Sequence, residues 1–176
     1  MLAARRACAN QLSSGVGNHR APWEAPNARE AFAVVAGGGE LLEIGPVRMR
    51  ILEDGSQRDN RIGAAISVMP AGSEGPPLHR HLMFDETFLV MNGVMRFSLG
   101  STQKDAKTGD YMIVPAGAWH TFTNASDATV EFYSTFTPAY YINYFRELAR
   151  LSAESRLTPQ ENIAVMKRYA TEPYSA

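Results

Sequence analysis

Short apolar segments separated by turn residues occupy the chain from Ala31 to about Thr137. Segments of four to eight residues bounded by glycine, proline or Asp-Gly are typical of β-strands, and no amphipathic helical pattern lies between them. A chain of many short strands folds as an antiparallel sandwich or barrel. The sequence therefore predicts an all-β domain over residues 31–137, with strands at 32–36, 41–44, 47–52, 62–69, 87–91, 94–99, 111–114, 120–123 and 130–136.

Two of these strands can be aligned with each other. Asn92-Gly93 lies between apolar segments and predicts a two-residue type I′ hairpin turn. Because side chains alternate with a period of two, one face of this hairpin is predicted to hold Glu86, Phe88, Val90, Met95 and Phe97. A carboxylate on an apolar face is costly to bury alone, so its position suggests a bound cation.

Two histidines, His79 and His81, lie shortly before this carboxylate. In an extended backbone they share one face with Cβ atoms about 6.6 Å apart, and both imidazoles can reach one metal ion at about 2.0–2.2 Å. Glu86 follows five residues after His81, an odd number, so it joins them only if the chain turns or bulges near residues 83–85. The alternative is a surface His-x-His pair beside an incidental glutamate.

A second segment, residues 109–124, decides between these alternatives. A glycine opens a strand, Pro115 and Gly117 interrupt it at a tight turn, and His120 begins the next strand. Together the two segments resemble the two motifs of the cupin family. The first motif falls on His79, His81, Glu86 and Gly93, and the second on Gly109, Pro115, Gly117, His120 and Asn124. One position departs from the family, because its leading glycine is Ser73 here.

The cupin resemblance implies a double-stranded β-helix (jelly-roll) barrel that holds a divalent transition metal. The implied ligands are His79, His81, Glu86 and His120. Three neutral imidazoles and one carboxylate leave the ion positively charged, with open positions for water or substrate. This donor set suits iron, manganese, nickel, copper and zinc, so the metal is not identified by the sequence.

The segment Phe-Thr-Pro-Ala-Tyr-Tyr followed by a helical tail also resembles the corresponding part of small single-domain cupins of the quercetin-dioxygenase-like group. More loosely, it resembles cupins of fungal polyketide pathways. This implies a dioxygenase-type oxidoreductase of secondary metabolism, acting on a small oxygenated aromatic or polyketide-like molecule, with Glu86 as ligand and catalytic base. Such a substrate needs a mostly apolar pocket, for which the candidates are Met69, Phe88, Met95, Phe97, Tyr111 and Phe122. The alternatives are a non-oxidative isomerase, cyclase, dehydratase or decarboxylase at the same metal, and a non-catalytic small-molecule binding protein.

Residues 138–176 form a predicted helical tail. Aromatic and leucine side chains recur at spacings of three and four over residues 139–151. Thr158-Pro159-Gln160-Glu161 is a capping box that predicts a second helix from Pro159 to about Tyr169. We interpret the aromatic stripe as packing that covers an opening of the barrel or a dimer surface.

Residues 1–30 are treated as a separate N-terminal arm. Met1 to Arg20 contains three arginines and no acidic residue, a composition typical of an organelle transit peptide. We favour the alternative of a short arm that packs on the barrel or on a partner subunit.

Composition restricts the partners. The net charge of −1 and the lack of a basic run argue against nucleic acid and anionic membranes. The single cysteine, Cys8, fits a reducing compartment, and no apolar run approaches the ~20 residues of a membrane span. We therefore expect a soluble, cytoplasmic protein with a small-molecule substrate. We also expect a homodimer to which the N-terminal arm contributes, because a barrel with exposed sheet edges must cover them.

Overall fold

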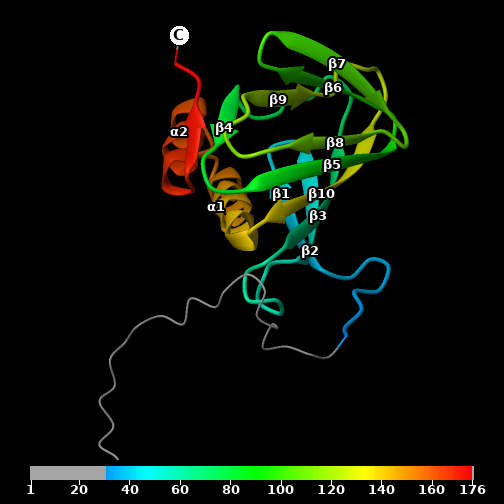
Figure 1. Ribbon diagram of the computed structural model, residues 1–176, viewed down its shortest axis with the longest axis vertical. Coiled ribbons are helices and arrows are strands. Elements are labelled where there is room, and N and C mark those ends of the chain that lie inside the picture. Colours follow the sequence, from blue (N-terminus) through cyan, green and yellow to red (C-terminus); the bar gives the residue numbers. More distant parts are fainter. Residues whose placement is uncertain (1–30, 176) are drawn as a thin grey trace, which may run out of the picture.

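The computed structural model describes residues 31–175, so the expectations for the N-terminal arm lie outside the described residues. Within that range the strands form two sheets that face each other as a barrel (Figure 1). The six-stranded sheet has the order β1 (Glu40–Ile44), β2 (Val47–Glu53), β3 (Gly63–Met69), β10 (Val130–Thr137), β5 (Asp85–Asn92), β8 (Tyr111–Val114). The five-stranded sheet has the order β11 (Thr171–Pro173), β4 (His79–His81), β9 (His120–Thr123), β6 (Val94–Leu99), β7 (Thr102–Lys107). The predicted all-β class is confirmed.

The strands predicted from residue 41 onward are present, with ends that differ by at most two residues. The predicted strand at 32–36 is wrong: its valines are exposed, and the chain turns there through a hydrogen bond from the Gly38 N–H to the Val35 carbonyl. Strand β7 was not predicted. It is an edge strand on which only Ala106 is buried, so it carries no apolar alternation.

The predicted hairpin at Asn92-Gly93 is also wrong. Strand β5 pairs with β10 and β8, whereas β6 pairs with β7 and β9, so the chain passes from one sheet to the other at this point. Gly93 has a φ of 85°, and a Cβ there would lie 3.0 Å from the Thr129 carbonyl oxygen. The predicted face is nevertheless buried throughout, because alternation along each strand decides which side chains point inward, whatever connects the strands.

The predicted tail contains a 3-10 turn (Ala139–Tyr141) and two helices, α1 (Ile142–Ala153) and α2 (Pro159–Arg168). As predicted, the Thr158 hydroxyl caps α2 by accepting a hydrogen bond from the Glu161 N–H at 3.2 Å. Helix α1 packs beside β1, and α2 lies beside β11, at one side of the barrel (Figure 1). In the described part of the chain, no helix is long and apolar enough to cross a lipid bilayer.

The buried apolar residues form two clusters. One fills the barrel between the sheets and includes Phe88, Phe97 and Phe132. The other lies between the sheet at β1–β3 and the two helices, and includes Phe136 and Tyr141. The helices therefore complete the core at an open side of the barrel, as the tail was predicted to do.

Candidate metal centre

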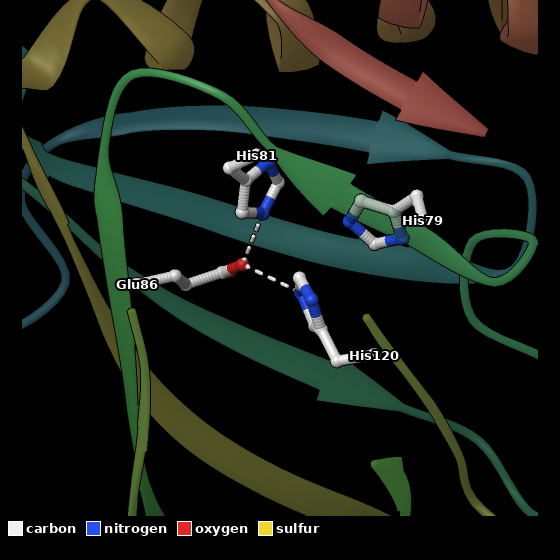
Figure 2. Close-up of side chains that lie close together, drawn as sticks. All are labelled: His79, His81, Glu86 and His120. Carbon is white, nitrogen blue, oxygen red and sulfur yellow. Dashed lines mark hydrogen bonds and ion pairs between the residues drawn. The ribbon is translucent and has the colours of Figure 1, made fainter. Parts of the chain in front are cut away.

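Four polar side chains from three strands converge inside the barrel. Strand β4 supplies His79 and His81, β9 supplies His120, and β5 supplies Glu86 (Figure 2). Residues 82–84 turn the chain between β4 and β5, as the odd spacing requires. All four side chains are buried, and their ligand atoms lie within 4.8 Å of one another. The structure thus brings together the four residues that the sequence singled out.

Backbone carbonyls fix the tautomer of two of the histidines. The Nδ1 of His79 lies 2.9 Å from the Pro77 oxygen, and the Nδ1 of His120 lies 3.1 Å from the Ala118 oxygen. A carbonyl oxygen only accepts hydrogen bonds, so Nδ1 is the donor in both rings. In the neutral ring, Nε2 then carries the free lone pair that a metal ligand needs.

A hydroxyl does the same for the third histidine. The Nδ1 of His81 lies 3.1 Å from Oγ1 of Thr171, which is directly opposite it in the β4–β11 pair. The Thr171 hydroxyl itself donates to the Tyr169 carbonyl at 3.2 Å, so its lone pair is left to accept from the imidazole. All three rings therefore direct Nε2 toward the same point. Thr171 was not predicted, because a three-residue strand after a helix has no signal in the sequence.

The electrostatics of the cluster favour a positive charge at its centre. Burial raises the pKa of Glu86, but the close contacts of its carboxylate with the imidazoles of His120 and His81 outweigh burial and hold that pKa at about 2. Burial lowers the pKa of His79 to about 3, and it also lowers the pKa of His81. The carboxylate is thus ionised while His79 and His81 are neutral at pH 7.

The close contacts in this cluster lead to the same requirement. Oε2 of Glu86 lies 2.9 Å from Nε2 of His81 and 3.4 Å from Nε2 of His120 (Figure 2). Two lone pairs facing a carboxylate oxygen repel one another unless a proton or a cation lies between them. A divalent ion satisfies the ionised carboxylate and the three ring nitrogens together, so these residues fit a metal.

A cavity of about 240 Å³ adjoins the cluster, and His79 and Glu86 form part of its wall. Its volume is below the roughly 300–1,000 Å³ of pockets for drug-sized ligands, so it suits a small molecule. Most of the remaining wall is apolar, with aromatic rings from both core clusters.

The six candidate pocket residues have different positions. Met69, Phe88 and Phe122 line the cavity. Met95 and Phe97 are fully buried in the barrel cluster, away from the cavity wall. Tyr111 is 55% exposed, because β8 buries Met112 and Val114 and its alternate positions point outward. Tyr111 is therefore not part of the cavity.

The helical tail contributes more of the wall than the sequence predicted. Tyr141, Tyr144, Phe145 and Leu148 line the cavity as well as packing in the core. Burial raises the pKa of both tyrosines well above its usual value, so they remain neutral. The hydroxyl of Tyr144 donates to Oδ1 of Asn162 at 2.6 Å. The spacing of three and four residues among these four side chains predicted that they share one helix face. It did not predict that a cavity lies in front of that face.

Comparison with known proteins agrees with this fold. Residues 65–136 match the family model described as "Cupin domain". An uncharacterized protein of Aquifex aeolicus (strain VF5) is 36% identical over 62 residues. These residues cover 35% of this chain and 50% of the length of that relative.

Solved structures show the same barrel. KdgF from Halomonas sp. superimposes with a TM-score of 0.55 at 14% identity, covering 62% of this chain and 94% of that chain. An RmlC-like cupin from Shewanella frigidimarina NCIMB 400 gives a TM-score of 0.53 at 22% identity, covering 62% and 92% of the two chains. Two facing sheets around a His-His-Glu-His cluster define a cupin barrel. Residues 65–136 of this chain form a cupin domain.

Proposed function

We propose that this cupin is a metal-dependent enzyme acting on a small oxygenated molecule of aromatic or polyketide-like type, most simply as a dioxygenase. The observation that carries the proposal is the position of the metal centre at the wall of an apolar cavity, with His79 and Glu86 facing both. His79 and Glu86 would hold an ion there beside a cavity that suits a small, mostly apolar ligand. A site with a purely structural metal would be closed and would more often contain cysteine.

The bound metal would supply Lewis-acid stabilisation of a phenolate or enolate oxygen and, for a redox-active ion, activation of dioxygen. The aromatic rings of Phe88 and Phe122 would hold the substrate against the centre and exclude water. Glu86 would accept the phenolic or enolic proton on its carboxylate. Because its pKa is only about 2, this transfer requires a substrate hydroxyl that is acidified at the metal centre.

The metal is tested by elemental analysis of protein purified without added metal. We expect close to one equivalent in the wild type, and a sharp loss in His79→Ala, His81→Ala and His120→Ala. His19→Ala is the matched control, because this histidine lies outside both motifs. Full metal occupancy in the triple variant would refute the assignment of these ligands.

The base role of Glu86 is tested by Glu86→Gln reloaded with metal. If the carboxylate is a base as well as a ligand, the reloaded variant remains impaired by about 10²–10⁴-fold in turnover. Activity that returns in proportion to bound metal would leave only the ligand role.

The reaction class is tested by oxygen uptake during turnover of phenolic and enolic substrates. Uptake that matches substrate loss supports the dioxygenase, whereas substrate loss without uptake supports an isomerase, cyclase, dehydratase or decarboxylase at the same centre. Ligand binding without any turnover would identify a binding protein.

We also propose a homodimer, formed at the β8 edge of the six-stranded sheet. On the outer face, Leu89 lies directly opposite Tyr111, and the neighbouring Ile113 is 64% exposed. An apolar sheet edge of this kind favours pairing with another copy. Light scattering at micromolar concentration should give a dimer that Ile113→Lys dissociates and Val35→Lys does not. A wild-type monomer would contradict the proposal.

A further inference from the structure

Two buried serines in the cavity wall have hydroxyl groups without a hydrogen-bond partner. Ser67 on β3 and Ser134 on β10 are 0% and 1% exposed, and neither Oγ has a partner among the described residues. Both residues line the cavity. Buried hydroxyls are normally satisfied, so this pair indicates that something in the cavity provides the missing partners.

The serines continue a line of polar groups that begins at the metal centre. Glu86 on β5 is opposite Phe136 on β10, and Ser134 lies two residues before Phe136, on the same face. Ser67 on β3 is opposite Phe132, two residues before Ser134. Glu86, Ser134 and Ser67 are therefore successive diagonal neighbours across three strands, each step being roughly 7–8 Å.

The charge of the cavity wall restricts what lies along this line. The charged residues that line it are Glu74 and Glu86, and the lining includes no lysine or arginine. A phosphate or carboxylate placed away from the metal centre would therefore meet no opposite charge. Phe88 and Phe132, by contrast, provide aromatic surface beside the two hydroxyls.

We propose that Ser67 and Ser134 recognise a second oxygen function of a neutral aromatic ligand whose first oxygen lies at the metal centre. The substrate class is then a neutral diphenol or hydroxyketone, with its oxygens at opposite ends of an apolar body. The inference rests on the proposed function, because that function places the first oxygen at the metal. The two serines are specificity residues, and neither is a metal ligand.

The test compares matched naphthalene probes on cobalt-loaded protein. The probes are 2-naphthol, 2,6- and 2,7-dihydroxynaphthalene, and 6-hydroxy-2-naphthoate; Kd is measured by calorimetry, and cobalt absorption reports contact with the metal. We expect one of the two diols to bind about tenfold tighter than 2-naphthol through its added hydrogen bonds. The naphthoate should bind more weakly than 2-naphthol, because its carboxylate would be buried without a countercharge.

The variants are Ser67→Ala, Ser134→Ala and their double, with Ser98→Ala on β6 as a control outside the cavity wall. In the double variant the diol should lose its advantage, while 2-naphthol binds as before. The control should keep the wild-type ratio. Each Ala variant removes a buried, unsatisfied hydroxyl, so the metal content and thermal unfolding midpoint should be at least those of the wild type.

Equal affinity for naphthol and both diols, an unchanged ratio in the double variant, or no binding of any probe would overturn the inference. The last two results would mean that water alone satisfies the serines. A serine-dependent diol advantage without any change in cobalt absorption would retain the recognition site and refute only the metal–oxygen contact of the proposed function.

Discussion

Replacing Thr171 by valine tests the metal centre without touching a ligand. The Thr171 hydroxyl accepts from Nδ1 of His81 at 3.1 Å, and the side chain is 1% exposed. Valine has nearly the same shape and is also β-branched, so it should keep strand β11 paired with β4. The change therefore removes the acceptor for Nδ1 of His81 and the donation of the hydroxyl to the Tyr169 carbonyl, and it leaves the shape of the side chain nearly unchanged.

The size of the effect follows from what the buried N–H loses. Removing an outer partner of a metal-bound histidine typically lowers metal affinity by about 10–100-fold, or roughly 1.4–2.7 kcal/mol. Leaving Nδ1–H unsatisfied costs about 1–3 kcal/mol in the metal-free protein as well, and that share lowers folding stability rather than metal affinity. We therefore expect the lower end, about tenfold, with a lower melting temperature of the metal-free variant.

The assay is competition for zinc or cobalt against a chromophoric chelator, with thermal unfolding of the metal-free protein in parallel. Thr171→Ser is the matched control, since it keeps the hydroxyl and should retain most of the affinity. If Thr171→Val binds metal within a factor of two of the wild type, the hydrogen bond does not support the ligand. If the serine variant falls as far as the valine variant, packing rather than hydrogen bonding is responsible.

Two other predictions concern the frame around the site. A Cβ on Gly75 would lie 2.2 Å from the Phe122 carbonyl oxygen, so Gly75→Ala should shift β9 and destabilise the protein by about 1–3 kcal/mol. Gly72→Ala is the control, because a Cβ there meets nothing within 4 Å. It should lower the free energy of unfolding in urea by only about 1 kcal/mol, because of the positive φ at Gly72. Equal losses of stability in the two variants would contradict the clash at Gly75. Arg146, together with hydrogen bonds from Ser56, lowers the pKa of Asp54 from 3.8 to about 2, so the stabilisation is present above pH 4 and lost as the pH falls toward 2. Asp54→Asn should therefore cost about 1 kcal/mol at pH 5 after solvent screening, and the difference should vanish near pH 2; a difference that persists there would refute the ion pair as its source.

The four residues of the cluster could be predicted because two segments of the sequence resemble the cupin motifs, and the placement of three of the residues also has local signals. His79 and His81 share a face through the period of two, and Glu86 required only a short turn, which the chain makes. The burial of Phe88 was predicted in the same way. These assignments depend on alternation within one strand, so they survive an error in strand pairing.

The pairing itself could not be read from the sequence. Asn92-Gly93 is a strong hairpin signal. In the structure, however, β5 pairs with β10 and β8 in one sheet, and β6 pairs with β7 and β9 in the other. Tyr111 shows the same limit: an aromatic in a strand fits either face of an edge strand, and the tertiary structure places it outside. Conversely, Tyr141 was assigned to packing because nothing local distinguishes a core wall from a cavity wall.

The pairing of β11 with β4 has a consequence for how the molecule assembles. Thr171 and His81 are separated by 90 positions, and the barrel strands between them must be in place before these two meet. Closing so long a loop is entropically unfavourable until many intervening contacts have formed. The third histidine is thus held in its ligand tautomer only late in folding. A partly folded chain in which β11 has not yet paired with β4 therefore lacks the hydrogen bond that orients His81.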